Sequence, residues 1–152
     1  MNYWLMKSEP DVYSIETLKK DKTTWWEGVR NYQARNFMMK DMKVGDLVLF
    51  YHSNAEPPGV AGIAKVSHAA EPDKSQFDKK SDYFDPKATK DKPNWFCVQV
   101  EYVNEFKHVV SLDALRGEKS LTEMLVLKRG QRLSVQPVDK KHFETIQKLG
   151  GK

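Results

Sequence analysis

Two neighbouring apolar runs in the first half of the chain constrain the fold more than any other feature. The first, "DLVLFYHS" (residues 46–53), is apolar without interruption from Leu47 to Tyr51, which is typical of a strand buried on both faces. The second, "VAGIAKV" (residues 60–66), follows the turn-forming "NAEPPG" and has Ala61, Gly62 and Ala64 where strands usually have bulky residues. Small residues at these positions leave room for either another backbone or a ligand.

Short strand-like and helical runs alternate along the rest of the chain. Further strands are expected at 3–8, 95–103 and 132–138, with "FKHVV" (106–110) returning beside 95–103. Helices are expected at 14–21, 30–41, 111–117 and 139–150, with Ser14 and Asp139 as N-caps, a capping box at 120–123, and Phe143, Ile146 and Leu149 buried. Several short strands with inserted helices predict an α+β domain built on a small, partly closed β-barrel.

Length and cysteine content limit the class of protein. A chain of 152 residues has the size of one domain (1–152) that can bury its own core, so neither disulfides nor a metal is needed. Cys97 has no partner for a disulfide, and the opening "MNYWLMKSEP" lacks the zones of a secretory signal. The longest apolar run is too short to span a bilayer. We therefore expect a cytoplasmic monomer without a membrane segment.

Positive charge is concentrated in the last part of the chain. The formal net charge is +4, and residues 128–152 contain seven basic residues against two acidic ones. This segment, including Arg129 and Arg132, suits the phosphate backbone of a nucleic acid. The alternative is a solvated, lysine-rich surface without a binding role.

The sequence offers few of the parts that a catalytic site requires. The four histidines are scattered, Cys97 has no second ligand for zinc, and neither a P-loop nor a G-x-G-x-x-G motif is present. We therefore expect no metal and no cofactor. His52, at the end of a buried strand, is the best candidate for a general base, and the alternative for it is a packed or capping histidine.

The segment "WWEGVRNYQARNFM" (residues 25–38) places two tryptophans beside many amide and guanidinium groups. It admits two interpretations. In one, a tryptophan ring and polar side chains bind a ligand. In the other, one tryptophan belongs to the core and one lies at the surface. The backbone carbonyls of neighbouring loops are then bound by Arg30, Asn31, Arg35 and Asn36.

Several motifs together resemble the EVE domain family over nearly the whole chain. They are "NYWLMKSEP", "WWEGVRNYQARNFM", "VGDLVLFYHSN", "PPGVAGIAKV", "EPDKSQFDKKSDYFDPKA", "WFCVQV" and "RLSVQPV". The resemblance implies a PUA-like fold whose members are non-catalytic readers that hold a modified nucleobase in a pocket. It also implies pocket residues, which in this sequence are Lys7, Ser8, Glu9, Trp26, Asn31, Arg35, Tyr51, His52 and Ser53.

A base removed from its stack requires a flat side chain to stack on and directed hydrogen-bonding groups for its edge. Trp25 or Trp26 can provide the ring, and the sequence leaves open which of them does. Arg30, Arg129 and Arg132 are expected to bind backbone phosphates, and the small residues of "GVAGIA" to leave space for a methyl group. The predicted partner is a nucleic acid with a modified base, either DNA or RNA. We expect Trp26→Ala to weaken binding more than folding.

Two functions of other classes remain as alternatives. One is a hydrolytic enzyme of the ASCH type acting on RNA or a modified nucleoside, in which His52 and Lys7 would be essential for turnover. The other is a protein-interaction adaptor that uses the long segment at residues 71–94, which is rich in Asp, Lys, Pro and Ser. A loop of this length is either functional or mobile.

Overall fold

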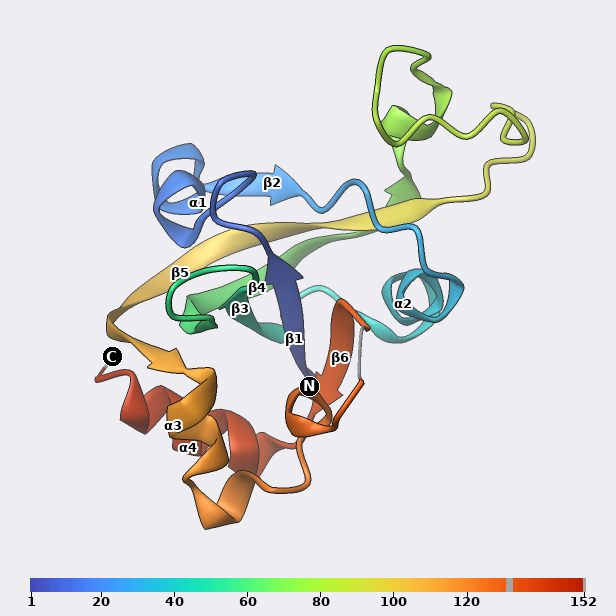
Figure 1. Cartoon of the computed structure of the whole chain (residues 1–152). Coiled ribbons are helices and arrows are strands. Elements are labelled where there is room, and N and C mark those ends of the chain that lie inside the picture. Colours follow the sequence, from blue (N-terminus) through green and yellow to red (C-terminus); the bar gives the residue numbers. More distant parts are fainter. Residues whose placement is uncertain (131–132, 152) are drawn as a thin grey trace.

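A computed structural model describes residues 1–130 and 133–151 of the chain. Within these residues, one sheet has six strands in the order β2-β5-β4-β3-β1-β6, and all neighbours are antiparallel except β1 and β3. The strands are β1 (Tyr3–Ser8), β2 (Thr23–Trp25), β3 (Leu47–His52), β4 (Gly59–Pro72), β5 (Phe96–Ser111) and β6 (Val135–Val138). The helices are α1 (Ile15–Asp21), α2 (Tyr32–Asn36), α3 (Leu112–Arg116) and α4 (Lys140–Leu149) (Figure 1). The predicted α+β class with inserted short helices is confirmed, and the sheet stays open because β2 and β6 are its edges.

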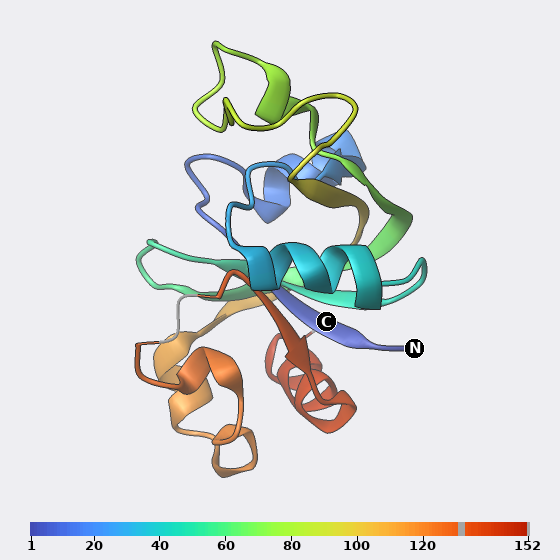
Figure 2. The ribbon, with the colours of Figure 1, turned by 90° about the vertical axis from the view of Figure 1, so that its right-hand side faces the viewer.

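Two hydrophobic cores lie on the two faces of the sheet. Because neighbouring residues of a strand point to opposite faces, Trp4 and Met6 of β1 belong to one core and Leu5 belongs to the other. β3 alternates in the same way, with Phe50 in the first core and Tyr51 in the second. Figure 2 shows α2 and α4 on opposite sides of the sheet. β3 is therefore buried on both faces, as its continuous apolar sequence predicts.

The helix boundaries follow the capping residues in the sequence. The Ser14 side chain accepts a hydrogen bond from the Thr17 backbone N–H at 3.1 Å and caps α1. Ser111 caps α3 through the Ala114 N–H at 3.1 Å. The predicted helix at 30–41 consists of α2 followed directly by a π-helical turn, Phe37–Asp41. These three predicted helices are confirmed.

Three local predictions were wrong. Residues 106–110 do not turn back, because β5 continues through them and stays paired with β4. The pairing register between β4 and β5 shifts at several positions. Ser120 begins no helix, since it lies inside the short 3₁₀ turn Lys119–Leu121. Leu149 is 41% exposed, because the buried face of α4 runs through Phe143 and Ile146 to Gly150, which packs against Phe106.

The small residues of β4 accommodate protein atoms, which decides between the two possibilities that the sequence left open. A side chain at Gly62 would collide with the Asn104 carbonyl of β5 and with Ile15 of α1. Ala61 and Ala64 belong to the first core. The space therefore serves the close approach of β5 and α1 to β4.

The long segment after β4 forms an ordered loop that projects from one end of the sheet (Figures 1 and 2). The buried Gln76 joins the two ends of this loop through hydrogen bonds. Its amide nitrogen donates to the carbonyls of Asp73 and Trp95, and its amide oxygen accepts from the N–H groups of Asn94 and Trp95, at 2.7–2.9 Å. We call residues 73–95 the pocket loop, because it brings Tyr83 to the cavity described next.

Candidate nucleic-acid site

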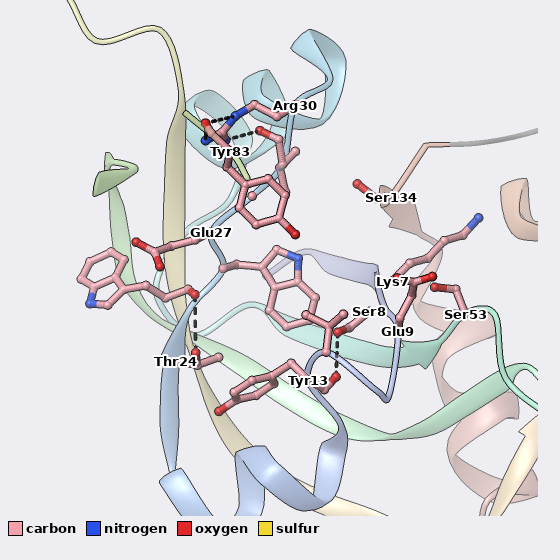
Figure 3. A pocket seen from close by; sticks show the side chains of 15 residues that line it. Lys7, Ser8, Glu9, Tyr13, Thr24, Glu27, Arg30, Ser53, Tyr83 and Ser134 are labelled. Carbon is pink, nitrogen blue, oxygen red and sulfur yellow. Dashed lines mark hydrogen bonds between the residues drawn. The ribbon is translucent and has the colours of Figure 1, made fainter. Parts of the chain in front are cut away.

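A cavity of about 550 Å³ opens where the C-terminal end of β1, the segment after β2 and the pocket loop meet (Figure 3). Its volume falls within the range typical of small-molecule sites. The lining residues are Lys7, Ser8, Glu9, Val12, Tyr13, Thr24, Trp25, Trp26, Glu27, Gly28, Val29, Arg30, Ser53, Tyr83 and Ser134. The cavity is therefore formed by segments that are far apart in the sequence.

Five of the nine residues predicted for the base pocket line this cavity. Lys7 and Ser8 end β1, Glu9 begins the next turn, Trp26 follows β2, and Ser53 follows β3. Because β1 and β3 are parallel neighbours, their C-terminal ends lie side by side. The Ser53 N–H donates to the Ser8 carbonyl at 3.0 Å, which extends the pairing beyond the strands.

The other four predicted residues lie outside the lining. Asn31 caps α2 by accepting from the Ala34 N–H at 2.9 Å. The Arg35 guanidinium donates to the Asn94 carbonyl at 2.9 Å and lies 4.7 Å from the Tyr32 ring centre. Both residues therefore hold α2 and the pocket loop in place.

Tyr51 and His52 are buried in the body of the protein. Tyr51 belongs to the second core, on the other face of the sheet. The His52 Nε2 accepts the Ile15 backbone N–H at 3.1 Å, and its ring meets that of Phe50 edge-on. Burial lowers the pKa of His52, against the opposing effect of the Glu16 and Glu105 carboxylates. Its free lone pair is thus used for a backbone contact, as in the capping interpretation of this histidine.

Arg30 lines the cavity, but its guanidinium is occupied by protein groups. It donates to the Asp73 carboxylate at 3.1 Å and to the Tyr83 carbonyl at 2.7 and 3.2 Å. The Asp73 side chain is only 1% exposed, and it also accepts the Gly28 N–H at 2.9 Å. This arrangement anchors the pocket loop to the segment after β2.

Tyr83 forms a wall of the cavity, and only glycine at position 28 permits its position. Gly28 has φ +90°, which other residues rarely adopt. A side chain there would also lie 2.7 Å from the Tyr83 ring. In Figure 3 the Tyr83 hydroxyl points into the cavity. Gly28 and Arg30 together fix this aromatic ring beside the opening.

Trp26 lies at the boundary between the first core and the cavity. Its ring meets Phe50 edge-on with centroids 5.3 Å apart, and the residue is only 8% exposed. The indole N–H has no hydrogen-bond acceptor among the described residues, although every fully buried polar side-chain atom there has a partner. This N–H is therefore accessible and can donate to a ligand. Trp25 also borders the cavity, but its ring packs 5.2 Å from that of His68.

Partial burial shifts the pKa of two charged groups of the cavity, Lys7 and Glu27. Burial lowers the pKa of Lys7, because a charged ammonium loses hydration there. Burial also raises the pKa of Glu27, and the nearby Asp73 carboxylate adds to this effect. A ligand that provides a hydrogen bond or an opposite charge would stabilise the charged form of either group.

Helix α4, with Lys140, Lys141 and Lys148, contributes no residue to the lining of the cavity. Arg129 is exposed after the last 3₁₀ turn, and Arg132 lies outside the described residues. In both ribbon views α4 and the pocket loop lie at opposite ends of the protein, with the sheet between them (Figures 1 and 2). The predicted phosphate contacts of Arg129 and Arg132 stay predictions.

Sequence reasoning missed several lining residues, including Val12, Tyr13, Thr24, Glu27, Val29, Tyr83 and Ser134. Glu27 and Gly28 lie inside the tryptophan-rich motif, so their position next to Trp26 was a usable signal. Tyr83 lies more than fifty residues further along the chain, and no local pattern links it to Trp26. Ser134 reaches the cavity only through the pairing of β6 with β1.

The sequence model of the EVE domain matches residues 2–149. Human thymocyte nuclear protein 1 is 40% identical over 97% of this chain and 73% of its own length.

Two solved structures are similar over the whole chain. A hypothetical protein from Leishmania major has a TM-score of 0.95 and 47% identity, covering 99% of this chain and 95% of its own. Human THYN1 protein in complex with 5-methylcytosine-containing DNA has a TM-score of 0.91 and 40% identity, covering 100% of this chain and 99% of its own. Because the family model matches residues 2–149 and the human relative is 40% identical over 97% of this chain, the chain belongs to the EVE domain family.

Proposed function

We propose that this protein is a non-catalytic DNA-binding module that holds 5-methylcytosine, rotated out of its strand, in the cavity beside Trp26. The observation that carries the proposal is the similar human THYN1 protein, whose structure was solved with 5-methylcytosine-containing DNA. With a TM-score of 0.91 over the whole chain, the two proteins share the same backbone fold.

The chemistry of the cavity supports this ligand. A base that has left its stack needs aromatic contact and hydrogen-bonding partners for its edge. Trp26 and Tyr83 offer aromatic surface, and the indole N–H and the Tyr83 hydroxyl offer hydrogen bonds. Val12 and Val29 offer apolar surface for a methyl group. Recognition of one methyl group is modest, about 1–3 kcal/mol.

A hydrolytic function is less well supported. The proposed general base, His52, is outside the cavity lining and already accepts a backbone hydrogen bond. Among the described residues, no three His, Cys, Asp or Glu side chains gather as a metal site. We therefore propose binding without turnover. Incubation of modified and unmodified strands with the protein should leave both chemically unchanged when they are analysed by mass spectrometry.

The decisive test compares matched strands. Fluorescence anisotropy should be measured with DNA and RNA strands that differ only in one cytosine or 5-methylcytosine. We expect the methylated DNA to bind about tenfold more tightly, in line with the modest value of a single methyl group. Equal affinities for methylated and unmodified strands of both polymers would contradict the proposal. A preference confined to methylated RNA would support recognition of the modified base but would show that the polymer is RNA rather than DNA.

Variants then link this preference to the cavity. Tyr83→Phe removes one hydroxyl and keeps the ring that packs over Gly28. Tyr102→Phe is a matched control, because Tyr102 packs at the margin of the first core, outside the cavity lining. Only the first variant should weaken binding of the methylated strand.

The cellular location and assembly state complete the proposal. The curated human relative has the name thymocyte nuclear protein 1. For this chain we retain the sequence-based expectations of a monomer in the cytoplasm, which light scattering and microscopy of a tagged protein can check. Among the described residues, no helix is long and apolar enough to cross a membrane.

A further inference from the structure

The cavity has two ends with different chemistry. Tyr83 and Glu27 lie at one end, whereas Lys7, Ser53 and Ser134 lie together at the other (Figure 3). The first end combines aromatic rings with a carboxyl group. The second end has an ammonium group and two hydroxyls, which is a typical set of groups for binding an anion, and one exposed carboxylate lies beside them.

Backbone pairing fixes the relative positions at the second end. The Lys7 N–H donates to the Ser134 carbonyl at 2.9 Å, just before β6 begins. On the other side of β1, the Ser53 N–H donates to the Ser8 carbonyl at 3.0 Å. The three side chains therefore project from adjacent strand ends of one sheet.

Lys7 is a cation without an acidic partner in the part of the chain that the structure describes. No carboxylate there lies within 4.0 Å of its Nζ, and its one charged or aromatic contact is the Tyr51 ring, whose centre is 5.8 Å away. Within the same residues, the hydroxyls of Ser53 and Ser134 have no hydrogen-bond partner. Partial burial removes hydration from the Lys7 ammonium and lowers its pKa, and an anionic ligand would compensate for the lost hydration.

The other basic residue of the cavity cannot provide this contact. Arg30 already donates to Asp73, Ser75 and the carbonyls of Val29 and Tyr83. Glu9 acts against an anion at the Lys7 end. It is exposed, and its carboxylate accepts from the Asn54 side chain at 2.9 Å.

We propose that Lys7, Ser53 and Ser134 form a subsite for the backbone phosphate adjoining the bound base, with Lys7 as the counter-charge. The cavity then binds a nucleotide unit rather than a base alone. This inference rests on the proposed function, because it places the base at the Trp26 and Tyr83 end. In this proposal Lys7 makes the phosphate contact that the sequence predicted for Arg30.

A double-mutant cycle between protein and DNA tests the subsite. One strand carries a single 5-methylcytosine with natural linkages. Two others carry a neutral methylphosphonate immediately 5′ or 3′ of that base, and a fourth carries it several nucleotides away. Anisotropy gives the affinity of each strand for the wild type, for Lys7→Gln and for Lys148→Gln, which changes an exposed lysine of α4.

We expect one adjacent methylphosphonate to weaken wild-type binding roughly tenfold, as a charge-assisted hydrogen bond is lost. Lys7→Gln should weaken binding of the natural strand by a similar factor and show no further loss with that methylphosphonate. Lys148→Gln should respond to the neutral linkage as the wild type does. Equal losses in the wild type and in Lys7→Gln for every linkage would overturn the subsite.

Two further results separate this inference from the proposed function. Lys7→Gln should keep the preference for methylated over unmodified strands, since it removes a phosphate contact only. Loss of that preference in the wild type contradicts the proposed function instead. If Lys7→Gln does not fold, Ser134→Ala and Glu9→Gln replace it, with weaker and tighter binding expected respectively. Unchanged affinity in both of these variants would also overturn the subsite.

Discussion

Trp26 illustrates how one residue serves both folding and the candidate site. The sequence motif predicted a pocket position, and the structure puts most of the side chain in the first core against Phe50. The two interpretations of the tryptophan pair are thus both partly right. A local motif cannot distinguish them, because the contacts of Trp26 come from Phe50 of β3 and from the Val98 carbonyl of β5 rather than from its own segment.

This double role changes the expected effect of mutation at position 26. Trp26→Ala should destabilise the protein by about 3–5 kcal/mol, as is usual when a large buried aromatic side chain is truncated. Trp26→Phe keeps a ring in the core and removes the indole N–H that faces the cavity. We therefore expect Trp26→Phe to fold stably and to bind methylated DNA less tightly. Chemical denaturation and anisotropy on the same samples check both statements.

A different outcome at this position would be informative. If Trp26→Ala unfolds at the same denaturant concentration as the wild type, the ring contributes little to the core. The sequence-based expectation of an effect mainly on binding would then hold.

At the scale of elements, the sequence predicted those parts whose signals are local. The hydrogen bonds of an N-cap and the apolar run of a strand involve only neighbouring residues. The start of two helices was therefore predicted correctly from Ser14 and Ser111, and the doubly buried strand from the apolar run of β3. The full length of β5 was missed, because its second half is held by bulged pairing with β4 rather than by a pattern of its own. The pocket loop was recognised as functional or mobile, but its contacts with Gly28 and Arg30 depend on the folded sheet.

The attachment of the pocket loop leads to a prediction about Arg30. Arg30→Lys keeps a positive charge near Asp73 but loses the pair of hydrogen bonds to the Tyr83 carbonyl, because a lysine lacks the planar fork of arginine. We expect faster hydrogen exchange in residues 78–92 and weaker binding of methylated DNA, with the folded core retained. Hydrogen exchange followed by mass spectrometry measures the first effect.

Lys65→Arg serves as a control for this experiment, since its partner Glu101 lies 3.9 Å away on an exposed part of the sheet. Exchange in the pocket loop that is the same in Arg30→Lys and the wild type would show that the hydrogen bonds of Gln76 suffice to hold the loop.

For the whole molecule, His52 links stability to pH. Burial lowers its pKa below the ordinary value of 6.5, so below about pH 6.5 the unfolded chain binds a proton that the folded protein excludes. Its contribution to stability is therefore lost as the pH falls. The free energy of unfolding should decrease from pH 7 to pH 5.5 more steeply in the wild type than in His52→Gln.

Urea denaturation at several pH values measures this difference. In His52→Gln, the amide oxygen of the new side chain can still accept the Ile15 N–H, so the variant isolates the titration from the hydrogen bond. Parallel pH dependence in the two proteins would show that other groups dominate the acid sensitivity.

The cavity beside Trp26, rather than the lysine-rich helix α4, is the part of the protein that we expect to bind the modified base. A titration followed by heteronuclear NMR tests it most directly, with methylated and unmodified DNA strands of the same sequence. We predict that methylated DNA alone shifts the Trp26 indole N–H signal together with the backbone amides of Gly28 and Ser53. Equal shifts with both strands, concentrated on the lysines of α4, would contradict the claim and indicate nonspecific binding to phosphate.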